Sequence, residues 1–230
     1  MNKIFTIFVL TFLSLCAIRV AQAEPLASQR VANRVESVVT GQQLTATNAF
    51  GTPLIMELAR KGDIETLRTL AQATPDKSFL DAHDKYNNNL FHVAKDARTV
   101  QFISALIRQA DGAKAYQRLT KMTNQRNTLD ETPLLAQIND GHTDTFYLLY
   151  RSSMLKQKND EFKNHLARIQ GSDPRMVQRH KEIYCKQIRQ LSSANGLTLL
   201  QAARAQIPYN SQMAPLAQQI TQAIPCLAQD

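Results

Sequence analysis

The segment DETPLLAQINDGH, residues 130–142, restricts the fold of this chain more than any other stretch. Thr132 can cap the first turn of a helix, and Pro133 fits that turn because its missing N–H would have no partner there. Gly141 suits the tight turn after the helix. A second helix follows, whose apolar face would consist of Phe146, Leu148 and Leu149. The segment therefore predicts a short pair of helices.

Three further stretches carry versions of the same pattern. They are GTPLIMELARKGDIETLRTL from Gly51, NNNLFHVAKDARTVQFISALI from Asn87, and NGLTLLQAARAQI from Asn195. The first has its Thr-Pro-Leu sequence one position early relative to the turn at Gly62, and the second lacks both the proline and the turn glycine. Recurrence of one pattern along a chain indicates structural repeats that stack on their neighbours.

These stretches resemble the ankyrin repeat, whose core reads roughly G-x-T-P-L-H-x-A-A-x-x-G-H, and the resemblance covers residues 48–150 and 195–224. It implies an all-α, ankyrin-like helical-repeat solenoid with long loops or hairpins along one edge. Members of that family hold protein partners through loop tips and the first helix of each repeat. In this chain those positions would be Tyr86, Asn87, Asn88, Arg126, Asn127, Leu129, Asn195 and Leu197.

The spacing of the copies is irregular. Equivalent positions near 53, 89, 132 and 198 lie 36, 43 and 66 residues apart, against about 33 in ankyrin repeats. The first two gaps predict extended loops or hairpins, around residues 74–76 and through 112–124. The last gap predicts an inserted or degenerate helical pair in the segment 151–191. Its helices would cover 153–170 and 174–191, with Gly171, Asp173 and Pro174 as stop, cap and first-turn residue.

The two ends of the chain complete this organisation. Residues 26–40 predict a capping helix within an N-terminal segment 24–47, with Val31 and Val35 on one face. Residues 211–224 predict the last helix of a C-terminal repeat and cap, 192–230. Residues 1–23 have the build of a secretory signal peptide, with Lys3, an apolar run and a small-x-small ending at Ala23. A retained membrane anchor and a lipid-modified Cys16 are the alternatives.

Cleavage after Ala23 would place the chain in the periplasm or outside the cell, with no stable membrane span. It would also leave two cysteines, Cys185 and Cys226. In an oxidising compartment two cysteines are most simply a disulfide, with two buried free thiols as the alternative. Cleavage takes away Lys3 and Arg19 and no acids, so the net charge falls from +8 to +6.

All of that remaining charge lies in residues 151–191, which hold ten cations against four acids. In 174–191 one helical stripe would contain Arg175, Arg179, Glu182, Lys186 and Arg189, and an apolar face would contain Met176, His180, Ile183, Tyr184, Ile188 and Leu191. Two interpretations stay open, a solvated helix face and a patch that binds a partner. The stripe has no interleaved aromatic residues, which together with export argues against nucleic acid.

No catalytic, cofactor-binding or metal-binding motif is present, so the sequence predicts a protein without catalytic residues, cofactor or metal. His92 and His142 occupy motif positions and are expected to be structural, and His83 lies in a polar turn. The first functional hypothesis is an exported protein that binds another protein as inhibitor, protective partner or scaffold of an envelope or secreted enzyme. The alternative is a binder of an anionic envelope surface (lipid, lipopolysaccharide or wall polymer) through 151–191.

Overall fold

The structure is a computed structural model that describes residues 44–75 and 77–228. The chain divides into two units, Met1–Thr40 and Gly41–Asp230, and the account below concerns the second. The predicted signal peptide at 1–23 and capping helix at 26–40 lie outside the described residues. The described part is mostly helical, which confirms the all-α prediction. Its one pair of named strands is a short hairpin of β1, Ser193–Ala194, and β2, Leu197–Thr198.

The first helix pair consists of α3, Leu54–Lys61, and α4, Ile64–Ala73. Gly62 makes the turn between them with φ +70°, a conformation that favours glycine. The Asp63 carboxylate then caps α4 by accepting from the Thr66 N–H at 3.1 Å. The N-cap of α3 is Pro53, whereas the N-cap of its counterpart α8, Pro133–Asn139, is Thr132, so Thr52 and Pro53 stand one position early relative to the start of the helix.

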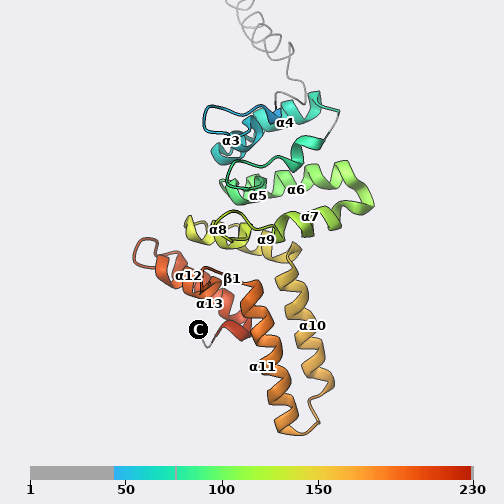
Figure 1. The fold of residues 1–230 in the computed structure, drawn as a ribbon, viewed down its shortest axis with the longest axis vertical. Coiled ribbons are helices and arrows are strands. Elements are labelled where there is room, and N and C mark those ends of the chain that lie inside the picture. The colour runs from blue at the N-terminus through green and yellow to red at the C-terminus, as the bar shows by residue number, and fades with distance from the viewer. Residues whose placement is uncertain (1–43, 76, 229–230) are drawn as a thin grey trace, which may run out of the picture. The chain divides into compact units, whose positions relative to one another are not determined.

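The second pair consists of α5, Leu90–Val93, and α6, Ala97–Asp111, preceded by a 3₁₀ turn η1, Ser78–Asp81. Asn89 caps α5, and Asp96 caps α6 through the Thr99 N–H at 2.8 Å, as Asp63 caps α4. The pair packs on the first one, because α3 contacts α5 and α4 contacts α6. Figure 1 shows the two pairs as successive layers.

The loop predicted through residues 112–124 is wrong. A 3₁₀ turn η2, Gly112–Lys114, leads into a helix α7, Ala115–Asn124, which packs against α6 and α9. Ala115, Leu119 and Met122 follow each other at helical spacing and are buried, so α7 is stabilised by its tertiary contacts. The wide gap between the second and third copies therefore holds an extra helix.

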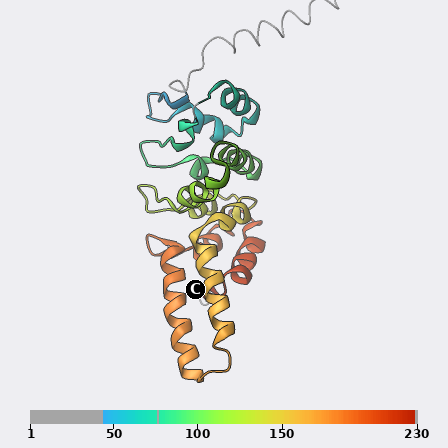
Figure 2. The same ribbon diagram turned by 90° about the vertical axis from the view of Figure 1, so that its right-hand side faces the viewer.

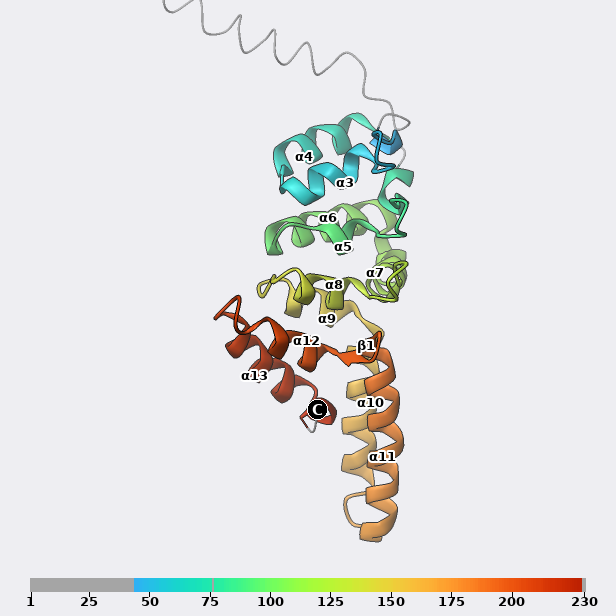
Figure 3. The ribbon, with the colours of Figure 1, turned by 60° about the vertical axis from the view of Figure 1, so that its left-hand side comes forward.

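The third pair consists of α8, Pro133–Asn139, and α9, Phe146–Ser152. Its turn and cap agree with the sequence, because the Thr132 hydroxyl accepts from the Leu135 N–H at 3.4 Å and Gly141 has φ +83°. The last pair consists of α12, Leu199–Gln206, and α13, Met213–Ala223, followed by a 3₁₀ turn η3, Pro225–Leu227. Because α8 contacts both α5 and α12, the last pair stacks directly on the third (Figure 3).

Between these pairs in sequence lie two long helices, α10, Met154–Arg168, and α11, Pro174–Leu191, which we call the α10–α11 hairpin. Both helices agree with the sequence prediction, and Asp173 caps α11 by accepting from the Arg175 N–H at 2.8 Å. Figure 2 shows the two helices side by side. Since α12 packs on α8, the hairpin is not a layer between them.

Candidate interaction surface

Three loop tips of one build precede the first helices of successive pairs, at residues 48–52, 84–88 and 127–131. In each, an Asn or Asp oxygen accepts hydrogen bonds from the backbone N–H groups two and four residues later, at 2.9–3.1 Å. The accepting residues are Asn48, Asp84 and Asn127. This short side-chain bond fixes the turn locally.

The residue three positions after each acceptor adopts a left-handed backbone. These residues are Gly51, Asn87 and Asp130, with φ of 74°, 60° and 61°. Glycine, asparagine and aspartate are the residue types that tolerate this region. The three tips are therefore built by the same residue chemistry at equivalent positions.

The side chain of the residue directly before each left-handed position is exposed to solvent. These residues are Phe50, Tyr86 and Leu129, which are 73%, 53% and 60% exposed. A fourth tip, the β1–β2 turn at Asn195 and Gly196, exposes Leu197 by 50%. We call Phe50, Tyr86, Leu129 and Leu197 the tip row. Figure 2 shows the four loops one below another along the same side of these layers.

Hydrogen bonds join the second tip to the third and the third tip to the fourth. The Thr128 N–H donates to the Tyr86 carbonyl at 2.9 Å, and Asn195 Nδ2 donates to the Leu129 carbonyl at 2.9 Å. Arg126 donates to the Ser193 carbonyl at 2.9 Å. Tyr86, Leu129 and Leu197 are thus carried on tips that hydrogen bonds connect to one another.

These bonds sort the predicted binding residues into two groups. Tyr86, Leu129 and Leu197 present exposed side chains. The side chains of the others build or connect the tips: Asn87, Asn88, Arg126, Asn127 and Asn195. Phe50 was missed by the sequence reading. Its signal was available, because Asn48, Phe50 and Gly51 stand 36 residues before Asp84, Tyr86 and Asn87.

Behind the second and third tips lies a groove of about 440 Å³. Its charged lining is mixed and includes Arg60, Lys95, Glu131 and Asp140. Burial raises the pKa of the Asp140 carboxyl. The groove can accept a polar partner of either sign, next to an apolar tip row.

His92 forms a buried wall of this groove. Its Nε2 bonds the Glu131 carbonyl at 3.1 Å and its Nδ1 lies 3.1 Å from the Asn89 N–H. Burial lowers the pKa of His92 to about 4, so the ring is neutral at pH 7. These contacts agree with a structural role. His142 lines the same groove, and His83 bonds Gln125 at 3.0 Å.

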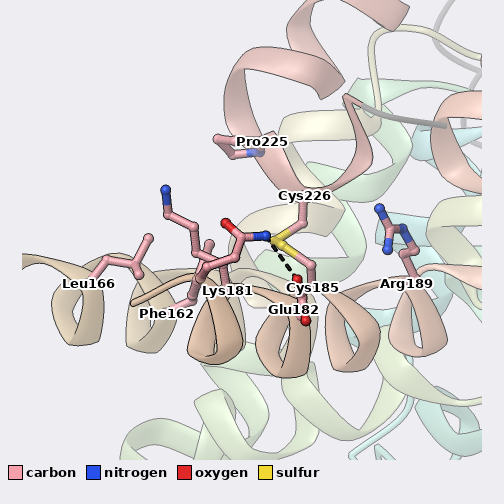
Figure 4. Close-up of a pocket in the computed structure, with 9 residues that line it drawn as sticks. Phe162, Leu166, Lys181, Glu182, Cys185, Arg189, Pro225 and Cys226 are labelled. Carbon is pink, nitrogen blue, oxygen red and sulfur yellow. Dashed lines mark hydrogen bonds between the residues drawn. A yellow bond between two sulfur atoms is a disulfide. The ribbon is translucent and has the colours of Figure 1, made fainter. Parts of the chain in front are cut away.

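A second hollow of about 380 Å³ lies where α10, α11 and η3 meet (Figure 4). Phe162, Leu166, Pro225 and a disulfide form its apolar lining, and Lys181, Glu182 and Arg189 its polar lining. The disulfide joins Cys185 of α11 to Cys226 of η3, in agreement with the sequence prediction.

The predicted basic stripe is only partly continuous. Arg175, Arg179 and Lys186 are exposed, and among the described residues no carboxylate lies within 4.0 Å of them. Arg189 is half-buried and lines the hollow.

The predicted apolar face of α11 is too wide. Ile188 is buried and His180, Tyr184 and Leu191 are half-buried, whereas Met176 and Ile183 are 41% and 51% exposed. At 100° per residue Met176 and Ile183 point well away from Ile188, and the neighbours of α11, α10 and η3, cover only the Ile188 side.

Other chemistry in the described residues is sparse. Within residues 44–75 and 77–228, no group of three His, Cys, Asp or Glu residues could hold a metal ion. His165 Nε2 and His180 Nδ1 lie 3.2 Å apart, a hydrogen bond between α10 and α11. None of the helices that the structure describes has an apolar stretch sufficient to cross a bilayer.

No family model matches the chain, and no curated protein matches it.

Proposed function

We propose that this chain is an exported, ankyrin-like repeat protein that binds another protein through the tip row and the adjoining groove. The observation that carries the proposal is the repetition of one exposed apolar side chain at the same position of successive tips. Singly exposed apolar residues are ordinary, but several of them at equivalent positions along one side favour an interaction site.

The ankyrin relation is supported by three features together. The motif residues Thr132, Pro133 and Gly141 cap and turn the third pair. The helix pairs stack in sequence order, and each pair is preceded by a tip on the same side. In this view the chain is a helical-repeat solenoid, and the α10–α11 hairpin is an inserted pair that leaves the stacking of α8 on α12 intact.

A preformed row favours affinity because little chain has to be ordered on binding. Aromatic side chains such as Phe50 and Tyr86 are the common anchors of protein interfaces. Truncation of an anchor is expected to cost about 2 kcal/mol, close to a 30-fold rise in Kd. The role proposed is stoichiometric binding as inhibitor, protective partner or scaffold, without catalysis.

Export is part of the proposal. The Cys185–Cys226 disulfide supports an oxidising compartment, because disulfides are rare in the cytosol. The apolar segment at 1–23 would direct the chain there, to the periplasm or beyond.

The test is capture from envelope extract with matched variants. The tip variant carries Phe50→Ser, Tyr86→Ser and Leu129→Ser. The control variant carries Tyr116→Ser, Tyr147→Ser and Tyr209→Ser, which are also exposed but lie outside the tips. One protein should be recovered in stoichiometric amount, and in moderate salt, by the wild type and the control but not by the tip variant.

Equal recovery by both variants would remove the tip row as the binding site. Recovery of no specific protein by the wild type would count against the proposed function as a whole. Circular dichroism of all variants checks that the helices are intact, so that loss of the partner reports on the surface.

A further inference from the structure

The outward side of α11 carries two adjacent stripes, one cationic and one apolar. Arg175, Arg179 and Lys186 are spaced by four and seven residues and therefore share one face. Met176 and Ile183 are seven residues apart and lie beside that face, both substantially exposed. We call these five residues the outer face of α11. None of them belongs to the tip row.

Glu182 lies on the same stripe, between Arg179 and Lys186, but among the described residues no acid of the α10–α11 hairpin forms an ion pair with the cations of the outer face. Asp160 pairs with Lys156, and Glu161 pairs with Lys158 at 2.6 Å. Asp173 caps α11. Glu182 accepts from Gln178 at 3.0 Å and lines the hollow beside the disulfide. The three cations of the outer face therefore carry charge that has no carboxylate within 4.0 Å in the described part of the chain.

The hairpin leaves this face uncovered. The main contacts of α11 are with α10 and η3, on the side of Ile188 and Cys185. Figure 1 shows both helices of the hairpin continuing past α12 and α13. A broad planar surface can therefore approach the outer face without meeting the last helix pair.

We propose that the outer face of α11 rests on the surface of a bilayer that contains anionic phospholipid. Lysine and arginine would contact the headgroups, while Met176 and Ile183 reach the boundary of the acyl chains, as in helices that lie in the membrane interface. The charge complementarity is local, because the segment 151–191 holds all of the excess positive charge expected after cleavage.

The chemistry of the face favours lipid over a folded protein. Its members are long, flexible side chains on a convex helix, and the face has no tryptophan, tyrosine or pocket to anchor a partner. A fluid array of anionic headgroups adapts to such a surface. The outer face and the tip row share no residue, so each can be substituted without changing the side chains of the other.

The first test is sedimentation with large unilamellar vesicles of phosphatidylcholine with or without one quarter phosphatidylglycerol. The stripe variant is Arg175→Gln, Arg179→Gln and Lys186→Gln. Its matched control is Arg108→Gln, Lys114→Gln and Lys121→Gln, which removes the same charge from exposed positions outside the hairpin. All three proteins keep the same residues 1–23, so any binding through that apolar segment is common to them.

Each cation near an anionic surface contributes about fivefold to binding, so the stripe variant should partition about 100-fold less onto the anionic vesicles. The control should stay within about threefold of the wild type. Binding of the wild type should fall steeply as salt is raised, because screening weakens surface attraction.

The second test uses the absence of tryptophan from this chain. Ile183→Trp creates a single fluorophore on the outer face, and Tyr209→Trp creates one at an exposed site outside the hairpin. Anionic vesicles should shift the emission of the first variant to shorter wavelength and leave that of the second unchanged.

Several results would overturn the proposal. Equal losses in the stripe variant and its control would mean that bulk charge drives binding. Equal binding of the wild type to both vesicle types would show that anionic lipid is not recognised. Self-association that Ile183→Gln abolishes, without any vesicle binding, would show that the face binds a second copy of the chain instead. The stripe variant should still capture the partner and the tip variant should still bind vesicles, which separates this proposal from the proposed function.

Discussion

At the scale of single residues, His92 is the position where burial and ionisation conflict most clearly. The ring lies between Asn89 of its own helix cap and Glu131 of the next tip. The Glu131 carbonyl requires a proton on Nε2, and the Asn89 N–H requires a lone pair on Nδ1. The Glu131 carbonyl favours the neutral tautomer with its proton on Nε2, and protonation of Nδ1 would exchange the bond from the Asn89 N–H for one to Asn89 Oδ1, 3.0 Å away.

The first prediction concerns this histidine and pH. The pKa of His92 is lowered to about 4 in the folded protein, against about 6.5 when unfolded. Above pH 6.5 the His92 ring is neutral in both the folded and the unfolded state, and its ionisation takes nothing from the unfolding free energy. As pH falls from 6.5 towards 4, the unfolded state alone binds the proton, and the protein loses up to about 3 kcal/mol.

The substitution His92→Gln should flatten this loss. Urea denaturation of wild type and variant at intervals between pH 7.5 and 4.5 measures the unfolding free energy of each. Other titrating groups, such as Asp96, are shared by both proteins and cancel in the difference. Parallel pH profiles would show that His92 does not titrate between the folded and unfolded states.

At the scale of elements, α5 depends on its neighbour α8. It has only four residues, too few for an independent helix. Gln137 of α8 donates from Nε2 to the carbonyls of Phe91, His92 and Ala94, at 3.3, 3.0 and 2.9 Å. One buried amide from the next layer therefore satisfies the end of α5.

The second prediction follows from that contact. Gln137→Leu should destabilise the protein by about 2–3 kcal/mol, because buried carbonyls lose their donor and the new side chain offers none. Gln206→Leu removes a similar bond, from Nε2 to the Asn139 carbonyl at 2.9 Å, at an exposed position, and should cost at most about 0.5 kcal/mol. Chemical denaturation compares the two, and similar losses would contradict the argument.

The elements differ in how far the sequence could predict them. The two helices predicted at 153–170 and 174–191 have nearly the observed bounds, and the predicted caps Thr132 and Asp173 are confirmed. The helix α7 was missed, because its few apolar residues are buried only once α6 and α9 lie beside it. Likewise Met176 fits an apolar helical face, and only the packing of the hairpin reveals that it is exposed.

The site divides in the same way. The positions of the tips could be predicted from the sequence, and Tyr86 and Leu129 were among the predicted binding residues. The use of Asn87 and Arg126 to connect one tip to the next depends on the stacking of distant segments, which spacing alone does not give.

At the scale of the whole described unit, the Cys185–Cys226 disulfide links the hairpin to η3 after the last pair. The cysteines are 41 residues apart in sequence, and a closed loop of that length stabilises the folded state by about 4 kcal/mol on the chain-entropy estimate. The layers contact mainly their neighbours, so this effect should be concentrated at one end of the stack.

The third prediction is that Cys185→Ser with Cys226→Ser lowers the unfolding free energy by about 3–4 kcal/mol under oxidising conditions. Reduced wild type should match the variant. Hydrogen exchange should show faster exchange in α11 and α13 and little change in α3 and α4. Uniform acceleration through every helix would indicate that the layers unfold as one cooperative unit.

The construction of the tips has a consequence for evolution and engineering. The side chains of Asn48, Asp84 and Asn127 fix their turns through hydrogen bonds to the backbone. The side chain two positions later is exposed and therefore contributes little to folding. Phe50, Tyr86 and Leu129 can therefore be exchanged while the scaffold keeps its shape. A library randomised at these positions would diversify the side chains of the proposed binding site and leave the fold unchanged.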